Sequence, residues 1–190
     1  DYSAGQGREH AGWTVLADND PTPRHTIYRS LCGLLGSLSA FDREAALDEI
    51  RRWAGRPRQG RCSRRAMTPE EVARLAAGGL VEVGSHGVTH TRFAAMTEQL
   101  QQWELQESRR VLRTVLGKDV TSVSYPFGTR KDFSPATARI AVEAGYTCAC
   151  ANFRGIARAG SDLFQLPRFI VRDWDGDDFA RRIEEQWARG

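Results

Sequence analysis

The chain has 190 residues, of which 41% are hydrophobic and 27% are charged. This length and composition are typical of a globular domain with its own core, and they exclude disordered and fibrous proteins. The 27 basic and 24 acidic residues leave a net charge of +3, an excess too small to favour nucleic-acid binding. The apolar runs are too short to cross a bilayer, so no transmembrane segment is predicted.

The N-terminal third is expected to combine helices with one strand. Residues 9–17 are compatible with a short helix, and residues 24–30 contain a cluster of β-branched and aromatic residues that favours a strand. A longer helix is predicted from Phe41 to Ala54, ended by Gly55 and Pro57. Its inward-facing residues are expected to be Leu47, Ile50 and Trp53.

A basic stretch follows this helix. Seven arginines lie between Arg51 and Arg65, and the same stretch contains Gly55, Pro57 and Gly60. Gly and Pro favour a loop, so a solvated loop is the simpler interpretation. Contact with an acidic partner is the alternative.

From Thr68 onward, helices and strands are predicted to alternate. Thr68-Pro69-Glu70-Glu71 is a capping box that begins a helix ending at Gly78, and Thr97 caps a long amphipathic helix that carries Leu100, Trp103 and Val111. Such alternation indicates parallel strands joined by crossover helices, an α/β fold. The predicted strands are Leu80–Val83, Thr121–Tyr125, Tyr146–Ala151 and Leu166–Val171, and the further helices begin at Ser134 and about Asp177.

The four cysteines form no zinc-finger or CxxC pattern. Cys148 and Cys150 alternate with alanines in an apolar segment, which places both on one face of a strand. Buried free thiols are the simplest interpretation. They fit a reducing compartment, so the location is left open between the cytoplasm, which is favoured, and the cell envelope.

Two of the four histidines lie in Ser85-His86-Gly87-Val88-Thr89-His90, directly after a predicted strand. A spacing of four brings both imidazoles to one side if the segment turns helically, and two imidazoles suit zinc and similar metals. The bare spacing also occurs by chance in surface loops. Its place at the carboxyl end of a strand favours a site, because functional groups of parallel sheets collect there.

The segment 84–90 resembles the His-x-x-x-His metal motif of the polysaccharide deacetylases, the carbohydrate esterase family 4 or NodB homology domain. The resemblance implies that His86 and His90 bind a divalent metal, most simply zinc. Ser124-Tyr125-Pro126-Phe127-Gly128 resembles the family's Arg-x-Pro-Tyr/Phe motif. It implies that the Phe127 backbone N–H stabilises the oxyanion and that Tyr125 lines the groove.

Two parts of the family pattern are missing. Ser124 stands where the motif has an arginine that orients the catalytic aspartate; Arg168 is either a substitute for it or an ordinary exposed strand residue. No complete Asp-Asp motif is present. Asp1 is either its second aspartate, and so a third metal ligand, or an ordinary terminal residue. The general base is therefore expected upstream of this chain, in a further segment of the same protein.

The resemblance implies a partial, distorted (β/α) barrel, with residues 1–66 forming its N-terminal part with a helical insertion and residues 67–190 its C-terminal part, one incomplete domain overall. It implies a metal-dependent deacetylase that removes N-acetyl groups, with O-acetyl groups as the less favoured alternative, from a bacterial polysaccharide or oligosaccharide. Without the base, the isolated chain is expected to be inactive or nearly so. The alternatives are a non-catalytic glycan-binding domain and another metal-dependent amidohydrolase.

Overall fold

A computed structural model describes residues 3–15, 17–60, 62 and 65–188. The chain divides into two compact units, Asp1–Arg61 and Cys62–Gly190. We call them the N-terminal and the C-terminal unit and describe each by itself. Among the described residues, no helix combines the length and the apolar character that a membrane crossing needs.

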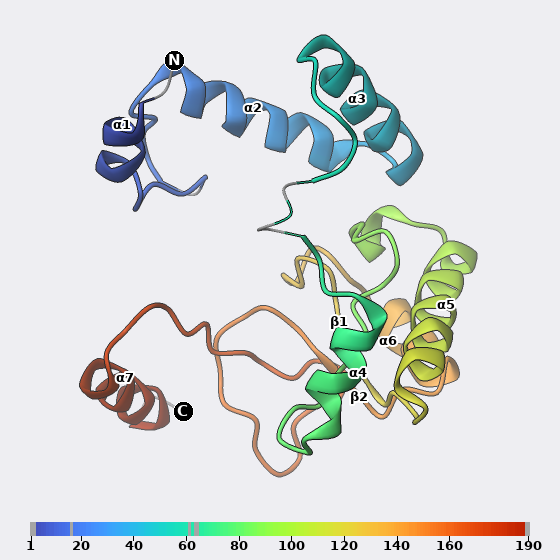
Figure 1. Cartoon of the computed structure of the whole chain (residues 1–190). Coiled ribbons are helices and arrows are strands. Elements are labelled where there is room, and N and C mark those ends of the chain that lie inside the picture. Colours follow the sequence, from blue (N-terminus) through green and yellow to red (C-terminus); the bar gives the residue numbers. More distant parts are fainter. Residues whose placement is uncertain (1–2, 16, 61, 63–64, 189–190) are drawn as a thin grey trace. The chain divides into compact units, whose positions relative to one another are not determined.

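The N-terminal unit is helical over most of its described length (Figure 1). Helix α1 (Ala4–Glu9) begins at a capping box formed by Ser3 and Gln6. Helix α2 (Pro23–Ser37) begins with proline at its first turn, and α3 (Ala40–Trp53) is capped by the Ser39 side chain.

Three predictions for this unit are wrong, two of secondary structure and one of burial. Residues 24–30 lie inside α2 and form no strand, because three strand-favouring residues do not outweigh a fifteen-residue segment with a proline start. Residues 10–15 form turns after α1 rather than a helix. The helix predicted at 41–54 is confirmed as α3, but Trp53 is 87% exposed and does not face inward.

The C-terminal unit is built on a short parallel sheet. Strand β1 (Ser122–Ser124) pairs with β2 (Cys148–Cys150), with Val123 opposite Ala149. Single bridges extend it on both sides, from Ser85 to Val123 and from Leu166 to Cys150. Parallel pairing is confirmed, whereas the described residues contain only these two strands and no closed barrel.

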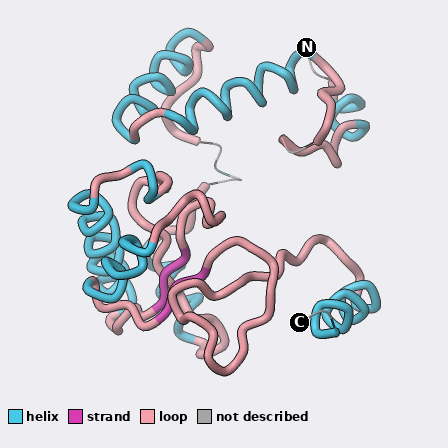
Figure 2. Tube along the Cα trace, turned by 180° about the vertical axis from the view of Figure 1, so that it is seen from behind, coloured by secondary structure: helices cyan, strands magenta, loops and turns pink. Residues whose placement is uncertain are grey.

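The strand predicted at 80–83 is therefore wrong, since the bridge lies beyond it at Ser85, and the strand predicted at 166–171 is reduced to a bridge at Leu166. Pro167 lacks the N–H that a strand after Leu166 needs, and Leu80 is 97% exposed. Loops fill residues 151–175 between β2 and the last helix, α7 (Gly176–Ala188) (Figure 2).

Three helices of this unit begin where their caps predict: α4 (Pro69–Ala77), α5 (Glu98–Leu116) and α6 (Pro135–Glu143). A 3₁₀ turn, η2 (Phe93–Ala95), lies between α4 and α5 in the sequence. Helix α5 packs against α4 and α6. The core joins the central strand residues Val123 and Ala149 to Leu105 of α5 and Ile140 of α6. The flanking strand residues therefore point to the opposite face of the sheet.

Helix α5 buries a face that the apolar pattern does not mark. Leu100, Trp103 and Val111 are 45%, 47% and 43% exposed. Its buried residues are Gln101, Glu104, Leu105 and Ser108. Three of these four are polar, and buried polar groups need hydrogen-bond partners.

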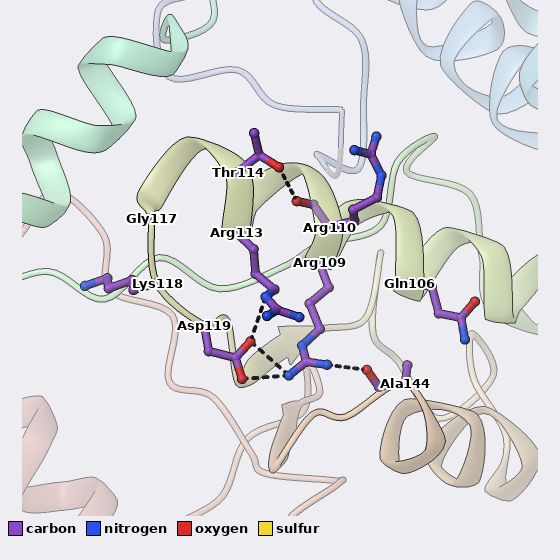
Figure 3. Close-up of a pocket in the computed structure, with 9 residues that line it drawn as sticks. All are labelled: Gln106, Arg109, Arg110, Arg113, Thr114, Gly117, Lys118, Asp119 and Ala144. Atoms are coloured by element: carbon purple, nitrogen blue, oxygen red, sulfur yellow. Dashed lines mark hydrogen bonds and ion pairs between the residues drawn. The ribbon is translucent and has the colours of Figure 1, made fainter.

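Arg109 ties α5 to the sheet and to α6. Its guanidinium donates to the carbonyls of Val120 and Ala144 at 2.9 and 2.8 Å, and pairs with Asp119 at 2.8 Å (Figure 3). Arg109, Asp119 and Ala144 line a cavity of about 770 Å³ at the carboxyl end of α5, which contains no residue of the His86–His90 loop. Because its partly buried arginine is committed to carbonyls and a carboxylate, we assign this cavity a structural role.

Candidate metal centre and oxyanion turn

His86 is held at the edge of the sheet by its neighbour. The Ser85 backbone N–H donates to Ser122 O, and the Ser124 N–H donates to Ser85 O, both at 2.9 Å. The His86 Nδ1 lies 2.6 Å from Ser124 O. A carbonyl only accepts, so Nδ1 carries the proton and the Nε2 lone pair is available to a ligand. A histidine arranged in this way fits a metal ligand.

The structure brings His90 to His86. Their ring centroids lie 4.9 Å apart, and both residues are exposed. His90 has a φ of 53°, in the left-handed region that non-glycine residues rarely adopt. Among the described residues, the only other non-glycine residue with positive φ is Phe127, at 61°. A left-handed backbone conformation costs a non-glycine residue energy and is found most often at functional sites. The two examples here, His90 and Phe127, belong to the two family motifs.

Phe127 lies beside the histidine pair. Its ring centroid is 4.9 Å from that of His90. The turn is closed by a 2.7 Å hydrogen bond from the Gly128 N–H to Pro126 O. In the part of the chain that the structure describes, the Phe127 N–H has no acceptor. An ordered N–H without an acceptor is the donor that an oxyanion requires.

A buried carboxylate braces this turn. Asp132 is 5% exposed and accepts the Thr129 N–H at 2.9 Å and the Thr129 hydroxyl at 2.5 Å. It also accepts Arg92 Nε at 2.9 Å, and the Arg92 guanidinium lies 4.0 Å from the centre of the Phe127 ring. This contact links the loop after His90 to the turn that carries Phe127.

A second buried carboxylate, Glu104 of α5, was missed by the sequence analysis. It accepts hydrogen bonds from Val88 and Thr89, between the two histidines. The signal for it was the helical spacing of Gln101, Glu104, Leu105 and Ser108, which places three polar residues on the face that α5 buries.

Arg168 lies in a cavity of about 320 Å³ that is also lined by His86, Ser124 and Cys150. Its Nε donates to Ala151 O at 2.7 Å. The Ser124 hydroxyl is buried without a hydrogen-bond partner among the described residues. Burial raises the pKa of the Cys150 thiol, which disfavours a thiolate here. The cavity therefore combines one imidazole and one guanidinium on the face of the sheet opposite the core.

Tyr125 does not line a groove. Its side chain is 0% exposed, stacked on Phe133 at 4.4 Å between ring centroids and in edge contact with Phe93. A side chain enclosed in this way faces no groove, so the prediction of a groove wall is wrong. The alternation of strand residues explains this: Tyr125, like Val123, faces the core.

Replacing Tyr125 with phenylalanine is expected to lower the free energy of unfolding by about 1 kcal/mol, because the hydroxyl donates to Phe164 O at 3.0 Å. Burial raises the pKa of Tyr125 above its ordinary value of 10.0. The native state therefore keeps a proton that the unfolded state loses above that pH, and stability falls as pH rises further. The free energy of unfolding, measured with urea at pH 8 and above pH 10, should decline less with pH in Tyr125→Phe than in the unsubstituted chain. An equal decline in the two chains would contradict this expectation.

The described residues contain no group of three or more His, Cys, Asp or Glu side chains placed to hold a metal. The pair His86 and His90 would supply two of the ligands of the predicted metal site. Asp1 lies outside the described residues, and the strand at 24–30 that supported its assignment is a helix.

Comparisons with known proteins identify the family. The family model described as polysaccharide deacetylase matches residues 35–149. The Bacillus subtilis protein YxkH, named for this family, is 26% identical over 119 residues, which are 62% of this chain and 41% of YxkH.

Two solved structures share the fold. The Streptococcus pyogenes deacetylase PplD has 20% identity and a TM-score of 0.55, over 63% of this chain and 52% of PplD. The Bacillus cereus polysaccharide deacetylase BC0361 has 24% identity and a TM-score of 0.55, over 62% of this chain and 37% of its own. The chain thus spans about half or less of the proteins it matches. Its matched residues include both motifs, and the chain belongs to the polysaccharide deacetylase family.

Proposed function

We propose that the protein is a metal-dependent deacetylase that removes N-acetyl groups, with O-acetyl groups as the less favoured alternative, from a bacterial polysaccharide or oligosaccharide. The observation that carries this proposal is the pair of exposed imidazoles, 4.9 Å apart between centroids, beside an ordered N–H without an acceptor among the described residues. Acyl transfer needs both elements, one to activate water and one to stabilise the tetrahedral oxyanion.

His86 and His90 would hold the metal, most simply zinc, because the His86 tautomer leaves Nε2 for a ligand. When bound, a divalent ion would lower the pKa of a bound water and polarise the acetyl carbonyl. The Phe127 N–H would donate to the oxygen that gains negative charge. Arg168, which lines the cavity beside His86, would orient a carboxylate base supplied from outside the described residues.

The activity of the 190-residue chain by itself is a separate part of the proposal. The described residues place no third ligand with the histidine pair, and water attack needs a base. We therefore expect the chain to bind zinc and to release acetate from N-acetylglucosamine oligomers only marginally above the metal-free control. Rapid, chelator-sensitive turnover by this chain would contradict the expected inactivity while supporting the deacetylase assignment.

The missing third ligand also favours a second candidate, a glycan-binding domain that has kept the fold without the chemistry. The two candidates differ in their dependence on the metal. A deacetylase loses acetate release in a chelator and with His90→Ala, whereas a binding domain retains oligosaccharide affinity under both changes. A third candidate, another amidohydrolase, would instead cleave non-sugar amides.

A further inference from the structure

We infer that Glu104 is a positioning residue of the metal centre: its buried carboxylate fixes the loop between the two histidines, and its negative charge strengthens cation binding there. This inference rests on the proposed function. Glu104 lies on α5, fourteen residues beyond His90 in the sequence, and belongs to neither sequence motif.

Each oxygen of the carboxylate is used by the loop. Oε2 accepts the Val88 N–H at 2.5 Å and the Thr89 N–H at 3.0 Å. Oε1 accepts the Thr89 hydroxyl at 2.5 Å. Glu104 is only 1% exposed, so these bonds are shielded from water. Three donors from two consecutive residues fix the turn that separates His86 from His90.

The loop is shaped around this carboxylate. Gly87 has a φ of 75°, and a Cβ built on it would lie 2.9 Å from Glu104 Oε2. Any other residue at 87 would strain the backbone and displace the carboxylate. One turn further along α5, the Ser108 hydroxyl lies 2.5 Å from the hydroxyl of Ser85. The helix thus holds the chain on both sides of His86.

Packing alone does not explain a charged residue at this position. Burying a carboxylate costs more than burying an apolar side chain, even when it is hydrogen-bonded. Its hydrogen bonds offset that cost, and its charge acts in surroundings of low dielectric constant. A cation bound by the imidazoles on either side of Val88 and Thr89 is attracted by that charge. Outer contacts of this kind commonly change metal affinity by roughly 10–100-fold.

The test uses the whole chain and cobalt(II) as the probe, with affinity measured per folded molecule from visible absorption. Glu104→Gln keeps the shape of the side chain and removes its charge. Thr89→Val removes the hydroxyl that donates to Oε1, and Thr89→Ser keeps it. Leu105→Ala is the matched control, because Leu105 is the next residue of α5, fully buried in the core. Thermal unfolding of every variant reports stability separately.

We expect Glu104→Gln to weaken cobalt binding by roughly 10-fold or more and to change the visible spectrum. Thr89→Val should weaken binding less, and Thr89→Ser should restore it. Leu105→Ala should lower the melting temperature and leave the affinity of the folded fraction unchanged. Affinity of Glu104→Gln within twofold of the unsubstituted chain, or an equal loss in Leu105→Ala, would reduce Glu104 to a structural role and overturn the inference.

Failure of the proposed function has a different signature. If the unsubstituted chain binds no cobalt, the metal centre is wrong, and amide hydrogen exchange then decides the role of Glu104. Exchange at Val88 and Thr89 should be at least 10-fold faster in Glu104→Gln than in the unsubstituted chain, with the rest of α5 unchanged. Equal exchange at these two amides would show that Glu104 does not hold the loop.

Discussion

Replacing His90 with alanine is expected to weaken zinc or cobalt binding by more than about 100-fold. This is more than the loss of affinity when a residue that only contacts a metal ligand is replaced. The structure describes two imidazoles at this site, with ring centroids 4.9 Å apart. Removing one leaves a single protein ligand, far from the three that a catalytic zinc site typically takes. Isothermal titration of the 190-residue chain with zinc measures the loss directly.

His10→Ala is the matched control for this measurement. His10 belongs to the N-terminal unit, where its Nδ1 lies 2.9 Å from Gln6 O. Its removal should leave zinc affinity unchanged. Retained affinity in His90→Ala would show that the metal binds elsewhere, and Cys148 and Cys150, on one face of β2, would be the next ligands to replace.

The features that the sequence predicts correctly depend on local chemistry. Thr68, Thr97 and Ser134 each cap a helix through their own side chains, so the starts of α4, α5 and α6 are readable from a few residues. The placement of His86 after a sheet residue also follows from local order, because a parallel sheet gathers such residues at one edge. The ring contact between His86 and His90 needed the left-handed backbone of His90, which spacing does not reveal.

The features that the sequence analysis missed depend on packing between distant segments. The apolar residues Leu100 and Trp103 marked one face of α5, but the helix buries Glu104 because a loop from another part of the chain donates to it. Tyr125 was assigned to a groove from its motif, while the pleat of β1 turns it into the core. In each case, contacts with segments far away in the sequence decide which side chain is buried. The hydrophobic pattern of a single segment does not reveal those contacts.

A single methyl group added at Gly145 is expected to destabilise the protein strongly. Its φ is 90°, and a Cβ there would lie 2.2 Å from Arg109 Nη1. The arginine can move, but moving breaks its hydrogen bonds to Ala144 and Asp119 (Figure 3). Backbone strain of about 1 kcal/mol and the lost bonds together should lower the free energy of unfolding by about 2–4 kcal/mol.

Two further variants separate the strain from the displacement of Arg109. Gly117 has a φ of 65° and open space around its Cβ position, so Gly117→Ala should cost only the strain, about 1 kcal/mol. In an Arg109→Met background, Gly145→Ala should lower the free energy of unfolding by a similar amount, because there is no guanidinium left for the methyl group to displace. Urea unfolding of the four chains in this double-mutant cycle gives the coupling. Additive effects of the two substitutions would mean that the added methyl group does not displace Arg109.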